Sequence, residues 1–465
     1  MAGGRRVVVR RVRLMIPGMP DEVTDVAVGD GAVTFGDAGR ADGRQVNGEG
    51  WIAAPGLIDL HVHLREPGQT HKEDICSGTR AAAKGGFAAV VCEPNTTPPL
   101  ADAATIGAFR NALRASACVE VYAKSAITEQ RAGRVPAMVT HNEVVVGHSD
   151  DGDPVAQRAV MAAAFQRAHE TMAAWQADQT VWEMDEGLRK SALPRVAPKM
   201  ADYLPLFLLH EEATPGSLGA LAAELGDCEP YAYEARLIAR DLVLLKATPK
   251  PRPFVHFSHV TLAESVEHIR GAKAHGLPVT AEATPHHLTL CADDIPDRDP
   301  NWKMNPPLRS RADVAALQAA LREGVIDCIA SDHAPHTPAE KAAGWEAAPF
   351  GCIGMETTVG VVLTRLVGEG VITLERAIEA LSYAPLRVLL RDGCAGQVLT
   401  AEGIAQRYPV RHLTLINPAA EWTVDPAQFE SKCRNTPFTG WRLRGLVEMT
   451  VVNGQVVYPF AEGVA

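Results

Sequence analysis

The chain has 465 residues, of which 46% are hydrophobic and 22% are charged, and its formal net charge is −11. This length and composition suit a globular protein with a large core, built as one large domain plus a smaller one or as two to three domains. The acidic balance argues against a nucleic-acid partner, because basic residues gather only at Arg5, Arg6, Arg10 and Arg11. No segment has the long uncharged apolar run of a membrane helix, so we expect no membrane association.

The cysteines predict a reducing environment. There are nine of them, an odd number, at irregular spacing and without a CxxC motif. This pattern favours free thiols in the cytoplasm over a disulfide framework, and it argues against a cysteine zinc site.

The first fifty residues read as short strands. Residues 5–15 and 21–36 alternate apolar and polar positions, and glycine–aspartate turns interrupt them. Strand-like runs then alternate with helix-like runs through the middle of the chain. The strand-like runs are 56–64, 88–94, 119–127, 143–149, 206–210, 254–259, 278–283 and 327–332. The helix-like runs include 72–84, 102–115, 234–247, 262–274 and 313–323.

About eight such βα units predict an α/β protein whose main domain is a (β/α)8 TIM-like barrel. An open doubly wound sheet is the alternative, but no GxGxxG motif follows the first strand. Residues 412–418 and 445–459 again read as strands, and Asn453-Gly454 is a strong hairpin signal. We therefore expect a small β-sandwich domain formed by residues 1–54 and 401–465, with the barrel over residues 55–400.

Candidate metal ligands stand at the ends of the predicted strands. His61 and His63 are two residues apart in a strand, so their side chains point to the same side and could converge on one ion. Such a pair alone is about as consistent with two structural histidines. Further candidates end other strands, namely Asp150, Asp151, His210, His259 and Asp332. Zinc prefers imidazole and carboxylate ligands of this kind, and barrel enzymes build their sites at this face.

Several motifs together resemble those of the dihydroorotases, cyclic amide hydrolases of the amidohydrolase superfamily. They are DLHVHLREPGQTHKEDICSGTRAAAKGGF, EPNTTP, SDDGDPV, TPHHLTL, KMNPPLR, ASDHAPHTPAEK and APFG. The resemblance runs from about residue 50 to about residue 360 and resumes at NTPFTGW. It implies the reversible, zinc-dependent cyclisation of N-carbamoyl-L-aspartate to L-dihydroorotate in de novo pyrimidine biosynthesis.

The resemblance also implies the metal ligands. His61, His63 and Asp332 would hold one zinc ion, and His210 and His259 a second. Asp151 would bridge the two, with Asp150 as the alternative, since no lysine that could be carbamylated stands in NEVVVGHSDDG. One or two zinc ions per subunit are implied, with two favoured. Asp332 would be the catalytic residue that moves the proton between the attacking water and the leaving nitrogen.

The substrate-binding residues follow from the same resemblance. Arg65 and His336 would bind the substrate carboxylate, and Asn95 and Asn305 would add directional hydrogen bonds. Phe350 and Gly351 would offer backbone groups to the ring, and His63 would also face the substrate. The expected partner is a small molecule; a homodimer and a complex with aspartate transcarbamoylase are the macromolecular partners that the resemblance raises.

The chain departs from the resemblance at several places, among them the HEEATPGSLG stretch that begins at His210 and an insert at LTAEGIAQRYP. Residues 165–203 form a longer connection than expected, with the character of a helical insertion carrying Trp175 and Trp182. Glu93 stands where a methionine is usual. The alternative functions are another cyclic amidohydrolase (allantoinase, hydantoinase or dihydropyrimidinase) and an inactive homologue that scaffolds aspartate transcarbamoylase.

Overall fold

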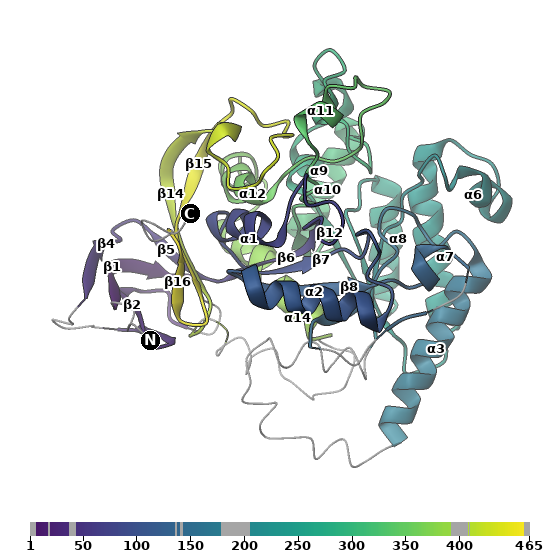
Figure 1. Ribbon diagram of the computed structural model, residues 1–465, viewed down its shortest axis with the longest axis horizontal. Coiled ribbons are helices and arrows are strands. Elements are labelled where there is room, and N and C mark those ends of the chain that lie inside the picture. Colours follow the sequence, from purple (N-terminus) through teal and green to yellow (C-terminus); the bar gives the residue numbers. More distant parts are fainter. Residues whose placement is uncertain are drawn as a thin grey trace.

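The computed structural model describes most of the chain and contains two separate sheets of eight strands each (Figure 1). The described residues are 6–16, 19–36, 43–134, 137–139, 143–177, 205–391, 408 and 410–459. One sheet is a nearly closed parallel barrel, and the other is built from both ends of the chain, which confirms the predicted fold class. Within the described residues, no helix is long and apolar enough to cross a membrane.

The barrel strands follow one another around the sheet in chain order, and every neighbouring pair is parallel. They are β6 (Leu57–Val62), β7 (Phe87–Cys92), β8 (Glu120–Ser125), β9 (Val145–His148), β10 (Leu206–Leu209), β11 (Phe254–Phe257), β12 (Val279–Ala283) and β13 (Cys328–Ile329). A parallel bridge between Val62 and His333 brings the last strand back to the first. Each of the eight predicted strand-like runs overlaps one of these strands, and only β7, which begins at Phe87 rather than at residue 88, starts outside its run.

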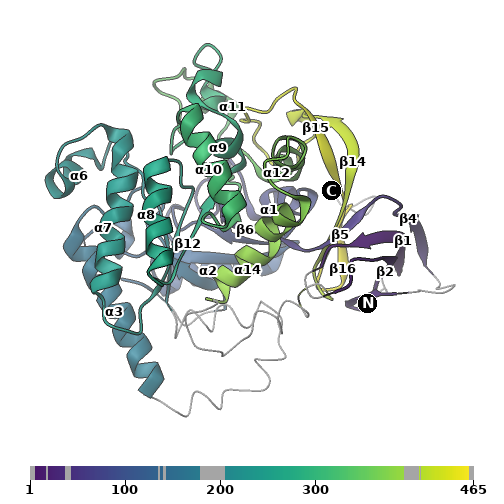
Figure 2. The same ribbon diagram turned by 180° about the vertical axis from the view of Figure 1, so that it is seen from behind.

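Helices surround the barrel (Figures 1 and 2). They are α1 (Ile75–Lys84), α2 (Ala103–Ser116), α3 (Arg158–Ala177), α6 (Leu218–Leu225), α7 (Tyr233–Ala247), α8 (Ala263–Ala274), α9 (Pro285–Thr289), α10 (Arg311–Glu323), α11 (Pro338–Lys341), α12 (Met355–Val361), α13 (Leu374–Ile378) and α14 (Ala384–Leu389). Local sequence fixes several of their ends. Asp74, Asp102 and Ser310 form capping boxes at the starts of α1, α2 and α10, and Gly324 at φ +77° ends α10.

The barrel strands are buried on both faces, because helices cover the outside and side chains fill the inside. All six residues of β6 and of β7 are buried. Most of these residues are apolar, as expected of a parallel sheet covered on both sides. The buried polar exceptions, among them Asp59, His61 and Lys124, therefore need a reason beyond packing.

The second sheet joins the two ends of the chain. Its strands are β1 (Val7–Leu14), β2 (Val23–Gly29), β3 (Ala32–Phe35), β4 (Arg44–Asn47), β5 (Ile52–Pro55), β14 (Leu413–Thr423), β15 (Arg442–Val452) and β16 (Gln455–Tyr458). Antiparallel pairing of β5 with β14 connects the two halves. Asn453 and Gly454 have φ values of +51° and +69° in the predicted hairpin turn between β15 and β16.

The predicted domain division stays a prediction. β5 ends in the terminal sheet at Pro55 and β6 starts the barrel at Leu57, close to the first boundary. The second boundary, near residue 400, lies outside the described residues. The predicted insertion begins within α3, whereas its part from residue 178 on, including Trp182, and the side chain of Trp175 are not described.

Candidate metal centre

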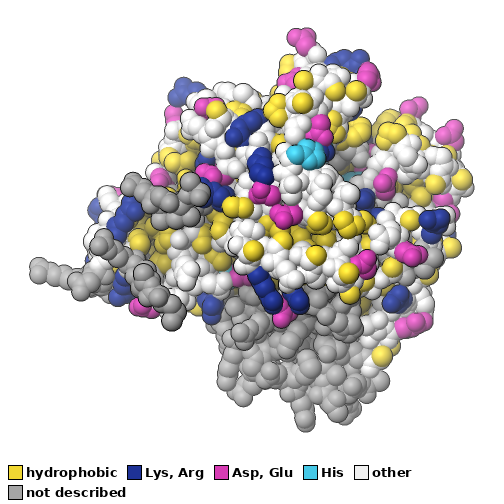
Figure 3. Space-filling model, viewed as in Figure 1, with side chains coloured by type: hydrophobic (Ala, Val, Ile, Leu, Met, Phe, Trp, Pro, Cys, Tyr) yellow, Lys and Arg dark blue, Asp and Glu magenta, His cyan; other side chains and the backbone are white. Residues whose placement is uncertain are grey.

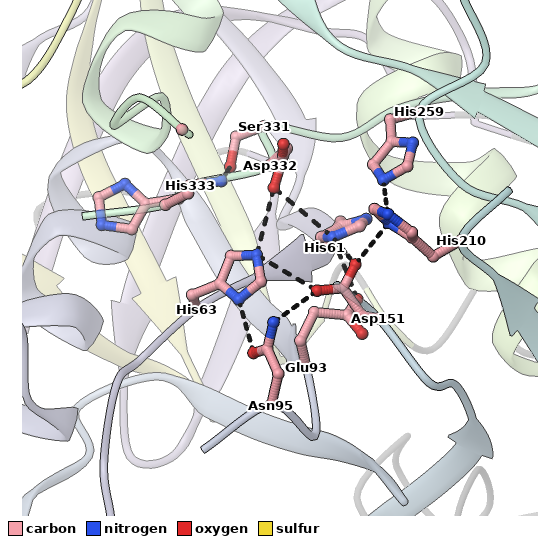
Figure 4. A network of polar contacts seen from close by, with 12 residues as sticks. His61, His63, Glu93, Asn95, Asp151, His210, His259, Ser331, Asp332 and His333 are labelled. Carbon is pink, nitrogen blue, oxygen red and sulfur yellow. Dashed lines mark hydrogen bonds and ion pairs between the residues drawn. The ribbon is translucent and has the colours of Figure 1, made fainter. Parts of the chain in front are cut away.

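Six of the predicted residues meet at one end of the barrel (Figure 4). His61 lies in β6, and the others follow the carboxyl ends of the strands, namely His63, Asp151, His210, His259 and Asp332. They meet because parallel barrel strands end at a common rim. All six side chains are buried.

His61, His63 and Asp332 form the first potential metal site. Oδ1 of Asp332 lies 3.3 Å from Nε2 of His63 and 3.5 Å from Nε2 of His61. Two ligand atoms that are each about 2.1 Å from a tetrahedral zinc ion lie about 3.4 Å apart, so this spacing suits a shared ion. One ligand atom from each of the three residues lies within 4.8 Å of the others.

His61 also belongs to a second potential site, together with Asp151 and His259, under the same 4.8 Å spacing. Oδ1 of Asp151 lies 3.1 Å from Nε2 of His61 and 3.0 Å from Nδ1 of His210. Nε2 of His259 lies 2.7 Å from Nδ1 of His210. Asp151 therefore lies between the histidines of the two predicted ion sites, where a bridging ligand would be placed.

Asp150, the alternative bridge, has a different environment. Its Oδ1 accepts hydrogen bonds from the backbone N–H groups of Ile127, at 2.8 Å, and Thr128, at 3.2 Å. Its Oδ2 accepts one from the Thr128 hydroxyl. These contacts tie the loop after β8 to the loop after β9, and they leave Asp151 as the carboxylate among the histidines.

The donor set fits a metal ion. The Nε2 atoms of His61 and His210 are buried and make no hydrogen bond to the described residues. Burial and the neighbouring His210 and His61 hold the pKa of His259 well below its ordinary value, which keeps a lone pair available. Burial would raise the pKa of Asp151, but His210 and His61 hold it well below its usual value, so this carboxylate is ionised.

Two further side chains orient these ligands. Glu282 in β12 accepts hydrogen bonds from Nδ1 of His61 at 3.2 Å and from Nε2 of His256 at 3.1 Å. This contact leaves Nε2 of His61 facing the cluster, as carboxylates behind metal-binding histidines do. Asn95 accepts from Nδ1 of His63 at 3.0 Å and donates to Oδ2 of Asp151 at 2.7 Å. Asn95, predicted to bind substrate, thus connects two predicted ligands.

Arg65 and His336 come together beside the cluster. Nη2 of Arg65 donates to Nε2 of His336 at 3.3 Å, and Nε of Arg65 lies 3.3 Å from the carbonyl oxygen of Pro335. Burial, with Arg65 and Lys72 nearby, lowers the pKa of His336, so its imidazole is neutral and can accept this hydrogen bond. The predicted carboxylate-binding pair is therefore in contact, with a guanidinium as its positive charge.

The remaining predicted substrate residues lie on two loops. The Phe350 ring is 41% exposed, and Nζ of Lys303 lies 4.5 Å from its centroid. Gly351 has φ +122°, and a Cβ there would lie 2.6 Å from Cβ of Ala334. The N–H of Gly351 already donates to the Lys303 carbonyl at 2.9 Å. The predicted backbone contacts of Phe350 and Gly351 to a ring stay a prediction, as does the role of the half-buried Asn305.

One buried residue that sequence reasoning missed organises this loop from far along the chain. The side chain of Asn435 accepts from the His336 N–H at 3.1 Å. It donates to the carbonyls of Ala334 at 3.0 Å and Gly351 at 3.1 Å. Its sequence signal is the NTPFTGW motif, which opens with this residue. Glu282 and Lys124 were missed as well, and Glu93 was noted only as a departure from the family pattern, without a role; each is a charged residue within or at the end of a strand run.

Comparison with known proteins identifies relatives over nearly the whole chain. A family model described as "Dihydro-orotase-like" matches residues 50–191. The dihydroorotase of Pelotomaculum thermopropionicum is 39% identical over 440 residues, which cover 94% of each chain. That of Bacillus thuringiensis is 39% identical, again covering 94% of each chain. That of a Geobacter species is 36% identical and covers 94% of this chain and 95% of its own.

Similar solved structures support the fold. The L-hydantoinase (dihydropyrimidinase) of Arthrobacter aurescens has a TM-score of 0.75 at 23% identity, covering 97% of this chain and 96% of its own. The dihydropyrimidinase of Brevibacillus agri has a TM-score of 0.70 at 19% identity, covering 97% and 94%. At these identities the likeness concerns the fold alone.

Proposed function

The chain belongs to the dihydroorotase family, and from that premise we propose that it catalyses the reversible cyclisation of N-carbamoyl-L-aspartate to L-dihydroorotate in pyrimidine biosynthesis. The observation that carries the proposal is the buried cluster of four histidines and two aspartates at the carboxyl rim of the barrel. Full-length similarity to dihydroorotases supports the choice of substrate.

The proposed cofactor is zinc, with two ions per subunit. His61, His63 and Asp332 would hold one ion, His210 and His259 the other, and Asp151 would bridge them. Bound zinc supplies a Lewis acid that polarises the amide carbonyl and lowers the pKa of water. Oδ1 of Asp151 lies 3.1 Å from Nε2 of His61 and 3.0 Å from Nδ1 of His210, so this carboxylate reaches a histidine of each proposed ion site, which supports two ions over one.

Asp332 is the proposed proton carrier. It follows β13 with φ +45°, a backbone conformation that few non-glycine residues adopt and that often marks a functional position. Its carboxylate faces His61 and His63, where the scissile amide would lie. In hydrolysis, Asp332 takes the proton from the attacking water and delivers it to the ring nitrogen that leaves. In synthesis, the same carboxyl group takes the proton from the carbamoyl nitrogen and returns it to the departing water.

Arg65 and His336 are the proposed binding site of the substrate carboxylate. A guanidinium binds a carboxylate through two parallel hydrogen bonds. The substrate is an anion and the chain carries a net charge of −11, so binding needs local positive charge, which Arg65 supplies next to His336. Figure 3 shows acidic and basic side chains scattered together over the visible face, which offers no large basic surface as a substitute.

The proposed location is the cytoplasm, which the free cysteines among the described residues support. A homodimer and a complex with aspartate transcarbamoylase stay predictions from the family resemblance. Light scattering of the purified chain, alone and mixed with aspartate transcarbamoylase, tests both.

The decisive experiment combines metal analysis with substrate comparison. We expect purified protein to contain about two zinc ions per chain and to open dihydroorotate at alkaline pH. Hydantoin, dihydrouracil and allantoin should be poor substrates. Zinc-loaded protein that leaves dihydroorotate intact but opens one of the other rings would refute the proposal, and protein that opens none would support an inactive homologue.

A further inference from the structure

A buried ion pair lies beside the proposed metal centre. Glu93 directly follows β7 and Lys124 lies in β8, and both residues are 0% exposed. Oε1 of Glu93 accepts a hydrogen bond from Nζ of Lys124, and the two form an ion pair. A fully buried pair of charges is costly to desolvate, and packing alone would be served as well by two apolar side chains.

The pair lies directly against His61. Oε1 of Glu93, which contacts Lys124, lies 3.4 Å from Nε2 of His61. That nitrogen also faces Asp151 at 3.1 Å and Asp332 at 3.5 Å, so it is the metal-facing atom of the ring (Figure 4). The ammonium of Lys124 is thus separated from a proposed zinc ligand by a single carboxylate oxygen.

This arrangement has an electrostatic consequence. Lys124 is fully buried, so neither water nor dissolved salt would screen its positive charge from a nearby divalent cation. Glu93 offers an opposite charge between the ammonium and His61. Its second oxygen, Oε2, is buried without a hydrogen-bond partner among the described residues, so the side chain has no other polar contact that would explain its position.

We propose that Glu93 and Lys124 form a charge-balanced pair of the metal centre, in which the Glu93 carboxylate screens the ion held through His61 from the Lys124 ammonium. The inference rests on the proposed zinc centre. Glu93 and Lys124 are positioning residues under this proposal, since neither needs to touch the substrate. Their effect is on how firmly the ions are held.

Three variants test the charge balance. Glu93→Gln keeps the side-chain shape and leaves Lys124 uncompensated, so zinc should transfer to a chromogenic chelator at least about tenfold faster than from the wild type. Lys124→Met leaves the Glu93 carboxylate unpaired near the ions, and zinc release should be as slow as in the wild type or slower. The double variant Glu93→Met/Lys124→Met removes both charges with unbranched side chains, and release should return to within about threefold of the wild type.

The readouts are zinc stoichiometry and the rate of zinc release, which do not depend on turnover. A matched control is Asp327→Asn, which leaves Lys273 without its carboxylate partner, 2.6 Å away, at the opposite end of the barrel. Asp327 directly precedes β13, so this variant should release zinc at the wild-type rate. Thermal unfolding of the metal-free variants separates loss of folding from loss of metal.

The outcomes distinguish this inference from the proposed function. Equal zinc release from Glu93→Gln and the wild type would overturn the charge-balance pair and leave the metal centre standing. A double variant that releases zinc as fast as Glu93→Gln would also overturn it, since the carboxylate would then act as a ligand in its own right. A wild-type chain that binds no zinc would refute the proposed function and this pair together.

Discussion

Asn435 connects the terminal part of the chain to the loops that carry the proposed substrate residues. Its side chain is 3% exposed and makes three hydrogen bonds, to the His336 N–H and to the carbonyls of Ala334 and Gly351. The substitution Asn435→Ala removes all three and leaves three buried backbone groups without this partner. We expect it to damage stability and substrate binding together.

The expected magnitude follows from the number of bonds. A buried hydrogen bond contributes about 1 kcal/mol net, so the loss of three lowers the free energy of unfolding by about 3 kcal/mol. The loops that hold His336 and Gly351 would then shift relative to Arg65. Because a misplacement of about 1 Å can cost about a hundredfold in rate, we expect kcat/KM for dihydroorotate to fall about 10- to 100-fold.

The assay pairs urea unfolding with steady-state kinetics and zinc content. Asn435→Asp is a sharper variant, because one carboxylate oxygen would face the carbonyls of Ala334 and Gly351, which lie 3.0 and 3.1 Å from the amide nitrogen it replaces. It should be at least as harmful as alanine. Asn111→Ala, on the exposed face of α2, is the matched control. If Asn435→Ala had wild-type kinetics and unfolded within about 0.5 kcal/mol of the wild type, the reasoning would be refuted.

Three other predictions concern the proton carrier, the metal and the pH dependence of folding. Asp332→Ala should abolish turnover while the protein stays folded by circular dichroism, and a normal rate would rule out its role as proton carrier. Removal of metal by a chelator should lower both the activity and the melting temperature. Zinc added back at about a thousand times its Kd should raise the free energy of unfolding by about 4 kcal/mol. An unchanged melting temperature would argue against a metal bound to the native state. Burial, with Arg411 nearby, lowers the pKa of His412 to about 3. As the pH falls, this imidazole is therefore protonated near pH 6.5 in the unfolded chain but only near pH 3 in the folded chain. The free energy of unfolding therefore falls as the pH drops through that window. The variant His412→Phe keeps an aromatic ring against Tyr408, and between pH 8 and pH 5 its free energy of unfolding should fall by about 2 kcal/mol less than that of the wild type, as measured by urea titration. Equal decreases in both proteins would contradict this.

Much of the architecture could be predicted from the pattern of residues along the chain. Eight apolar runs alternating with amphipathic runs predicted the barrel, and each of β6 to β13 overlaps one of those runs. The predicted helix over 102–115 differs from α2 by one residue at each end, because Asp102 supplies a local capping signal. The strands could be predicted because a parallel strand buried on both faces needs a continuous apolar run, and such a run can be recognised in the sequence.

The candidate ligands could also be predicted, since each lies in or follows an identifiable strand and parallel strands of a barrel end at one rim. The choice between Asp150 and Asp151 was open from spacing alone. In the structure, the Asp150 carboxylate accepts hydrogen bonds from the N–H groups of Ile127 and Thr128, whereas Asp151 contacts the histidines. Those partners lie in the loop after another strand, so only the folded chain brings them together.

Only the tertiary structure revealed the residues that support the ligands. Asn435 lies 99 positions from His336 in the chain, and no local pattern indicates that they are hydrogen-bonded. Glu93 directly follows β7 and Lys124 lies in the neighbouring β8, and nothing in either run indicates that the two side chains form an ion pair. The sequence determined which side chains could bind metal, because ligand chemistry belongs to single residues. Tertiary structure decided how they are oriented and charge-balanced, because those properties depend on contacts between distant segments.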